Sequence, residues 1–189
     1  MKFLQLFSLV IAGLAFSLSS LSAATQLSPE AGADEILAAI EAELGTNCEN
    51  VNTRRIVQAV MALARANPDR VGDIVAVAVG CKPEAAVALV YETSRVFPDQ
   101  AADIAGKAAL NNPGAAGAIA RAAATAAPSQ APSIRNAVAS AVPTLNSSVL
   151  DSAINQGAEQ GSSSLPVAIP ELNDLEFDSD SNNPSPSGL

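Results

Sequence analysis

Apolar residues recur along the middle of the chain with the spacing of a helix. Between residues 52 and 157 they fall at offsets of 3, 4 and 7, which place their side chains on one face of an α-helix. The pattern returns every 15 residues, and one position of the repeat reads Ala59, Ile74, Leu89, Ile104, Ile119, Ile134 and Val149. Repetition at a fixed period predicts an array in which each unit contributes one short amphipathic helix.

A proline closes each unit and marks the boundary between neighbouring helices. The prolines lie 15 residues apart, at Pro68, Pro83, Pro98, Pro113, Pro128 and Pro143. Proline suits the first helical position because its missing N–H would lack a partner there anyway. Asn52, Asn67 and Asn112 precede helix starts, and we expect them to be N-caps. The alternative is one long helix kinked at every proline, but each interior proline would cost about 3 kcal/mol.

These signals predict an all-α fold, a short α-solenoid of about eight helices. The expected repeat helices span about 53–66, 68–80, 84–96, 98–111, 114–126, 130–141 and 144–157. Ahead of them, residues 25–51 form an N-terminal capping region, with a helix from Pro29 to Leu44 that Gly45 ends. We expect Pro132 to delay or distort its helix, and Gly157 to end the last helix and the alanine-rich repeat domain (52–157).

The core positions change in size along the array. Early units carry valine, isoleucine and leucine, whereas between Ala101 and Ala127 they are mainly alanine with one isoleucine in each helix. Alanine is the best helix former, yet it buries little apolar area, and burial contributes about 25 cal/mol per Å². The sequence therefore predicts a thin core and modest stability in the second half of the array.

Residues 1–24 have the features of a secretory signal peptide. Lys2 supplies the positive charge, an apolar stretch follows, and Ser22-Ala23-Ala24 offers a small-residue cleavage site. We expect cleavage between Ala24 and Thr25 and a secreted product, either extracellular or periplasmic. An uncleaved membrane anchor is the alternative. No later stretch reaches about 18 uninterrupted apolar residues, so no transmembrane helix is expected in the mature chain.

Cys48 and Cys81 are the only cysteines, and both lie in the exported part. An even number of cysteines in an oxidising compartment favours one disulfide between them. A redox site or a metal site is the alternative, but the chain contains neither a CxxC motif nor a histidine. In a stack of short helices, a bridge over 33 residues would tie the cap to the second full repeat helix.

The composition changes again near residue 158, after which serine, proline and carboxylates dominate. We expect residues 158–189 to form a disordered acidic tail. Within it, Leu172, Leu175 and Phe177 alternate with carboxylates, which is typical of short segments that dock on a partner. A solvated tail that only improves solubility is the alternative interpretation.

The sequence offers little of the chemistry that catalysis requires. Without histidine the chain lacks the usual Ser–His–Asp and Cys–His groups and the HExxH zinc site, and no phosphate-binding glycine loop is present. Read as a calcium loop from Asp178, the tail has Asn183 and Leu189 where glycine and glutamate are required. We therefore predict no catalytic residue, cofactor or metal. The carboxylates that qualify by type alone are Asp69, Asp73, Glu84, Asp99 and Asp103.

The net charge of −9 makes nucleic acid an unexpected partner. The remaining hypotheses are two. The first is a non-catalytic helical-repeat protein that acts as an interaction scaffold, or as a structural component of the cell envelope or exterior, with an unknown protein partner. The second is a membrane- or lipid-associated helical protein, because small-residue helices such as those between Ala101 and Ala127 also pack closely in membranes.

Overall fold

The computed structural model describes residues 25–163, so the expected signal peptide and most of the expected tail lie outside the described residues. The described part is entirely helical, which confirms the predicted all-α array. Its helices are α1 (Ala33–Leu44), α2 (Thr53–Ala66), α3 (Val71–Cys81), α4 (Ala86–Val96), α5 (Ala101–Asn111), α6 (Ala116–Ala126), α7 (Ala131–Ala141) and α8 (Ser147–Ser163).

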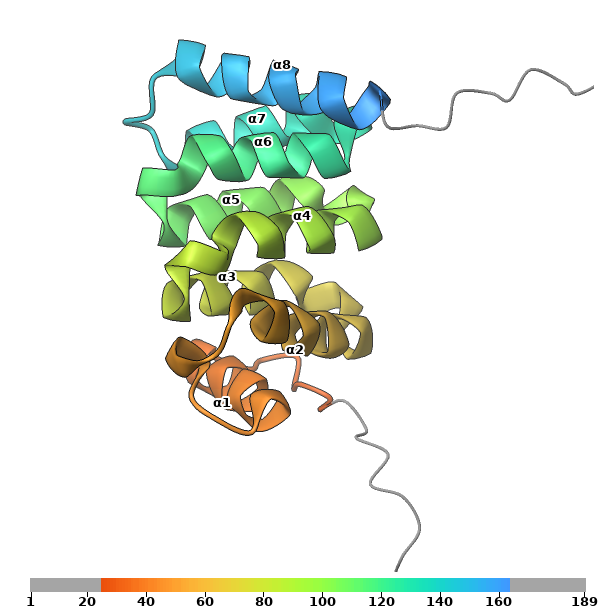
Figure 1. Ribbon diagram of the computed structural model, residues 1–189, viewed down its shortest axis with the longest axis vertical. Helices are drawn as coiled ribbons and strands as arrows, with labels where there is room; N and C mark the ends of the chain where they lie inside the picture. Colours follow the sequence, from red (N-terminus) through yellow and green to blue (C-terminus); the bar gives the residue numbers. More distant parts are fainter. Residues whose placement is uncertain (1–24, 164–189) are drawn as a thin grey trace, which may run out of the picture.

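The helices stack in two layers along the long axis of the molecule (Figure 1). From α3 onward each helix packs mainly on the helices two units away along the chain, so α3, α5 and α7 form one layer and α4, α6 and α8 form the other. Consecutive helices are joined by very short connections and make contact between the layers. A stack of this kind is an α-solenoid, in which each unit is stabilised by its neighbours.

We predicted that each repeating proline would be the first residue of an α-helix, and for five of them this is wrong by three residues. Each of the five prolines from Pro68 to Pro128 opens a three-residue 3₁₀ turn, and the α-helix follows immediately; the turns are Pro68–Arg70, Pro83–Ala85, Pro98–Gln100, Pro113–Ala115 and Pro128–Gln130. The residue before each of these prolines lies outside the helical region, as Lys82 shows with φ −133° and ψ 78°. Steric contact with the proline ring disfavours the helical region at that residue, so the preceding helix ends there.

Of the three predicted N-caps, only one is correct. The side chain of Asn52 accepts a hydrogen bond from the backbone N–H of Arg55 at 2.9 Å, which satisfies a free donor at the start of α2. Asn67 and Asn112 do not cap the turns that follow them. Their side chains bind other segments instead: Asn112 donates to the carbonyl of Pro83, and Asn67 donates to the carbonyl of Thr25.

The capping helix α1 begins four residues later than predicted. Ser28 to Ala31 form a turn closed by a backbone hydrogen bond, and Gly32 precedes the first helical residue. The guanidinium group of Arg70 donates to the carbonyls of Ser28, Pro29 and Ala31, so these oxygens are bound outside the helix. The predicted end is correct, because Gly45 adopts a left-handed conformation with φ 67° that favours glycine.

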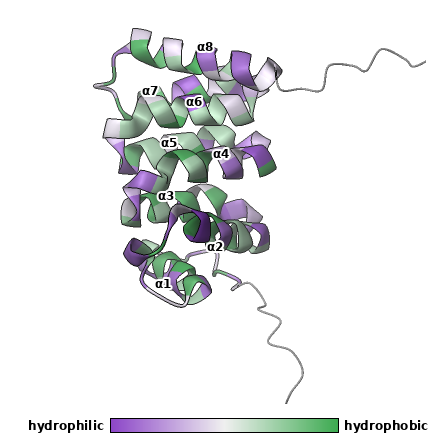
Figure 2. Cartoon of the chain, viewed as in Figure 1, coloured by the Kyte–Doolittle hydropathy of each residue, from purple (hydrophilic) through white to green (hydrophobic). Residues whose placement is uncertain are grey.

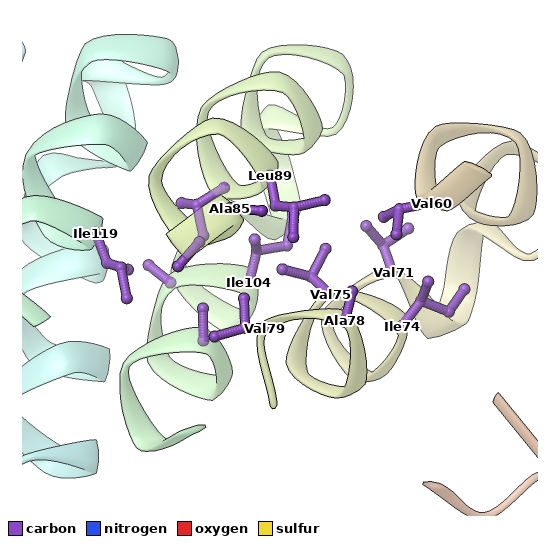
Figure 3. Packing of buried hydrophobic residues seen from close by; sticks show 14 of the residues in the cluster. Val60, Val71, Ile74, Val75, Ala78, Val79, Ala85, Leu89, Ile104 and Ile119 are labelled. Carbon is purple, nitrogen blue, oxygen red and sulfur yellow. The ribbon is translucent and has the colours of Figure 1, made fainter. Parts of the chain in front are cut away.

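The core lies between the two layers and follows the predicted repeat positions. Figure 3 shows core side chains pointing into the space between the helices, among them Val75, Leu89, Ile104 and Ile119, each of which is fully buried. The apolar residues line the stack while strongly hydrophilic residues gather at the helix ends and around α1 and α2 (Figure 2). In α5 and α6 most of the buried positions are alanines, as predicted for the stretch from Ala101 to Ala127, whereas α7 and α8 bury isoleucine, valine, leucine and glycine instead.

Pro132 neither delays nor visibly shortens its helix, which corrects our expectation. Helix α7 has 11 residues, the same number as α3, α4, α5 and α6. Pro132 is the second residue of α7. The first four N–H groups of a helix have no intrahelical acceptor, so a proline at this place removes no hydrogen bond.

Helix α8 continues six residues past Gly157, where we predicted that it would end. Gly157 and Gly161 are both buried against α6. A Cβ atom added at Gly157 would collide with the carbonyl oxygen of Arg121, and one added at Gly161 with that of Thr125. The glycines thus let two backbones touch, and this packing offsets the poor helix propensity of glycine. The folded array therefore extends to Ser163, and residues 158–163 belong to it rather than to the tail.

Candidate functional site

The carboxylates that qualified for acid–base chemistry by type are placed in different surroundings. Asp69, Glu84 and Asp99 follow prolines in the 3₁₀ turns and are exposed. Glu84 forms a 2.7 Å ion pair with Lys82. Only Asp73 and Asp103 are brought together, and a lysine lies between them. Within residues 25–163, no group of three or more histidine, cysteine, aspartate or glutamate side chains has an arrangement that could hold a metal ion.

A small ion cluster links α3 and α5. The ammonium group of Lys107 lies 2.8 Å from Asp73 and 3.0 Å from Asp103, and Arg70 donates to Asp73 at 2.9 Å. Burial opposes ionisation of Asp73, but the hydrogen bonds from Lys107 and Arg70 outweigh it and hold the pKa of this carboxyl below its usual value. The pKa of Lys107 is raised because its two carboxylate partners outweigh its partial burial. Each of the four groups forms an ion pair within the cluster, which therefore joins α3 to α5.

The disulfide joins the two cysteines that the sequence analysis paired. Cys48 and Cys81 have Cα atoms 6.3 Å apart and connect the turn after α1 to the last residue of α3. The adjacent Lys82 is buried and donates to the carbonyl of Glu49 at 3.0 Å. The bridge therefore fixes the capping region on the array, beside the buried residues Leu44 and Val51.

The first described residues are also fixed on the array. The side chain of Asn67 donates to the carbonyl of Thr25 at 2.9 Å and accepts from the backbone N–H of Leu27 at 2.7 Å. Ala24 lies outside the described residues, so cleavage between Ala24 and Thr25 stays a prediction. A chain that begins at Thr25 would retain every one of these contacts.

One face of the array carries a shallow apolar depression that crosses three helices. We call it the α4–α6–α8 surface and define it by two adjoining hollows of about 410 and 450 Å³. The first lies between α4 and α6, and the second lies between α6 and α8. Both hollows include Ala118 and Arg121, so they form one continuous surface. The residues lining them are Glu84, Val87, Ala88, Tyr91, Gly117, Ala118, Arg121, Ala122, Thr125, Ser148, Val149, Ser152, Ala153 and Gln156.

This surface holds a large share of the exposed apolar side chains. Five large hydrophobic residues among residues 25–163 are exposed, and three of them line the surface: Val87, Tyr91 and Val149, with 42%, 36% and 53% of their area exposed. The surrounding alanines and Gly117 keep the floor shallow and smooth. Contiguous exposed apolar groups of this kind are a common feature of surfaces that contact other molecules.

A single arginine lies at the centre of the surface. Arg121 is exposed, lines both hollows and makes no salt bridge within the described residues. The only other charged residue on the surface is Glu84, whose charge is compensated by Lys82. An arginine within an apolar surface favours a ligand that brings a carboxylate together with apolar groups, because guanidinium and carboxylate match in geometry and charge.

Sequence reasoning did not single out Tyr91, Arg121 or Val149 as a group. Val149 was predicted to lie on the apolar face of the last helix together with Leu150 and Ile154; the structure buries Leu150 and Ile154 but leaves Val149 exposed. Two signals were available. Tyr91 is the only tyrosine of the chain, and Arg121 interrupts an otherwise uncharged stretch of alanines. Neither indicates a surface until α4, α6 and α8 are known to lie side by side.

Among residues 25–163, no helix has the length and apolar character required to cross a bilayer. Most of the alanines between Ala101 and Ala127 are buried in the core of the array. Comparisons with protein-family models, with curated proteins and with solved structures find no match to this chain.

Proposed function

We propose that the chain is a secreted or periplasmic helical-repeat protein without catalytic activity, and that its α4–α6–α8 surface binds a protein partner. The observation that carries the proposal is the continuous apolar surface centred on the unpaired Arg121. Solenoids commonly bind partners across neighbouring units, since several parallel helices present one extended face. The disulfide and the absence of a membrane-spanning helix among the described residues are compatible with an exported protein.

The shape of the surface fits a protein or peptide better than a small molecule. Its two hollows are open to solvent and merge at Ala118 and Arg121. Small-molecule sites are usually enclosed and bury most of their ligand. A flat apolar patch with one central arginine instead has the composition of a protein contact, where aromatic and arginine residues are enriched.

A test of this proposal uses the mature chain, residues 25–189, to capture partners from an envelope or extracellular extract of its own source. Two variants, Tyr91→Ser and Arg121→Glu, change the surface without touching the core. Leu110→Ser is the matched control, because Leu110 is 62% exposed on α5, away from this surface. We expect each surface variant to cost about 2 kcal/mol of binding free energy, a loss of roughly thirtyfold in affinity.

Three results would decide the matter. A partner that binds the wild-type chain and the Leu110→Ser control, but neither surface variant, supports the proposal. Partner binding that all three variants retain would place the contact elsewhere on the array. Co-flotation of the mature chain with liposomes, in the absence of any protein partner, would favour the membrane- or lipid-associated alternative.

A further inference from the structure

The α4–α6–α8 surface lies beside the end of the described chain. Helix α8 forms one edge of the surface and ends at Ser163. Residues 164–189 follow directly and contain five carboxylates, at Glu171, Asp174, Glu176, Asp178 and Asp180, with no basic residue. The chain thus places an acidic segment close to an apolar surface whose one uncompensated charge is positive.

The length of the connecting chain allows the segment to reach any part of the surface. Leu172 comes nine residues after Ser163, and nine extended residues span about 30 Å at most. Helix α8 has 17 residues, which correspond to about 25 Å. A chain that turns back after Ser163 can therefore bring Leu172 and the residues after it alongside Arg121 or Tyr91.

The residue pattern of this segment is complementary to the surface. In an extended chain Leu175 and Phe177 lie on one side, while the carboxylates that alternate with them lie on the other. The apolar side matches the exposed apolar groups of the surface, which Val87, Tyr91 and Val149 provide. A flanking carboxylate matches Arg121, which has no salt bridge among the described residues.

We propose that residues 171–178 dock on the α4–α6–α8 surface of their own chain and act as an internal ligand that an external partner must displace. This inference rests on the binding role proposed for the surface and adds a form of regulation to it. The partner that replaces the segment would share its chemistry, a short peptide in which leucine or phenylalanine side chains alternate with carboxylates.

The tether determines how weak the contact can be. A short flexible connection gives an effective concentration of about 1 mM, so a segment docked for nine-tenths of the time requires a dissociation constant near 0.1 mM as a free peptide. Occupation to that extent would weaken the apparent affinity of any competing ligand about tenfold. Both consequences can be measured.

Tyr91 provides the signal, because the chain has one tyrosine and no tryptophan, and the tyrosine lies on the surface in question. A peptide of residues 171–180, which lacks tyrosine, is titrated into the mature chain (25–189) and into the same chain with Leu172→Ser, Leu175→Ser and Phe177→Ser. Tyrosine fluorescence and its quenching by acrylamide follow the binding. We expect a dissociation constant near 0.1 mM for the triple variant and a value about tenfold weaker for the wild-type chain.

Two matched controls accompany the titration. Val167→Ser with Ile169→Ser changes the same stretch of chain outside the docking residues, and this chain should bind the peptide as weakly as the wild type. In the triple-variant background, Arg121→Gln should weaken the peptide at least tenfold, whereas Arg65→Gln, on α2, should leave it unchanged.

Equal peptide affinity for the wild-type chain and the triple variant would overturn the inference, as would an Arg121→Gln variant that binds normally. Absence of binding up to about 1 mM would overturn it as well, because the tether could not then hold the segment in place. If the peptide fails while partner capture still depends on Tyr91 and Arg121, only the internal docking is wrong. If neither peptide binding nor partner capture depends on Tyr91 and Arg121, the α4–α6–α8 surface is not a binding site, and the proposed function fails as well.

Discussion

The two halves of the array are built from one repeating unit but pack in different ways. In α2 and α3 the positions facing the core carry branched side chains, Ile56, Val60, Val71 and Val75, all fully buried. In α5 and α6 the equivalent positions are alanines, Ala101, Ala105, Ala116 and Ala120, and these are fully buried too. In the C-terminal half, Gly157 and Gly161 of α8 lie against the backbone carbonyls of Arg121 and Thr125 in α6, and Gly106 of α5 lies against Ala137 of α7.

This difference separates two properties of the repeat. The 15-residue period comes from the proline turn and the length of the helix, which both halves share. The distance between stacked helices comes from the size of the core side chains, which changes along the chain. A core of small residues can remain closely packed because the helices lie nearer to one another. The dispersion contacts of close packing then offset part of the stability that is lost by burying little apolar area.

The N-terminal half has further connections that the C-terminal half lacks. The disulfide, the hydrogen bonds of Arg70 and those of Asn67 fix the first 25 or so described residues on the array. The C-terminal half relies on the direct contact between α8 and α6 at Gly157 and Gly161. The following predictions test whether the halves are indeed stabilised in these two ways.

Removal of the disulfide should have the largest effect. Replacing Cys48 and Cys81 by alanine frees a loop of 33 residues, for which chain entropy predicts a loss of about 3–4 kcal/mol in the free energy of unfolding. Urea unfolding measures the loss. Amide exchange should show weakened protection in α1, α2 and α3 while α6 and α8 keep theirs. Equal loss of protection in all helices would mean that the array unfolds as one unit.

Enlarging a core alanine should destabilise the C-terminal half. Ala120→Val adds two methyl groups where helices already touch, so we expect a cost of about 1–3 kcal/mol. Val75→Ala, at the equivalent position of α3, is the matched change in the opposite direction and should cost about 2 kcal/mol by leaving a cavity. A stabilising effect of Ala120→Val would show that the alanine core contains unfilled space.

Glycine substitutions should distinguish backbone contact from open surface. Gly161→Ala places a methyl group against the carbonyl of Thr125 and should lower the free energy of unfolding by about 2 kcal/mol. Gly117→Ala, in α6, meets no atom within 4 Å and should raise it by up to about 1 kcal/mol, because alanine favours the helix. Thermal or urea unfolding of both variants checks the opposite signs.

The ion cluster between α3 and α5 should contribute least. The pKa of Asp73 is lowered from 3.8, so its stabilisation is present above that pH and is lost as the pH falls through the folded-state value. The pKa of Lys107 is raised from 10.5, so its contribution is present below that pH and is lost at higher pH. Since these groups are partly exposed and solvent screens their charges, we expect Lys107→Met to cost no more than about 1 kcal/mol at neutral pH.

The pH dependence gives this last prediction its control. The stability difference between the wild-type chain and Lys107→Met should shrink as the pH falls through the lowered folded-state pKa of Asp73, and it should also shrink in high salt. A difference that persists at low pH would assign the role of Lys107 to packing by its aliphatic chain, not to its charge.

Much of the fold could be predicted because its signals are local. The apolar spacing identified the helices, the prolines located their boundaries, and an even cysteine count paired Cys48 with Cys81. Errors arose where a distant segment competes with a local rule. The side chain of Asn67 binds the segment that begins at Thr25 and does not cap the turn that follows Asn67. Gly157 continues a helix instead of ending it, because α6 lies against it.

The candidate surface, too, could be predicted from the sequence only in part. The sequence by itself determined the repeat, the alanine-rich core and the isolated Arg121, since these depend on residues within one unit or its neighbours. Only the tertiary structure decided that α4, α6 and α8 lie in one layer, that Val149 is exposed and that Tyr91 and Arg121 share a surface. The physical reason is that a helix has one face for its own layer and another for solvent, and packing between units chooses which residues lie on each.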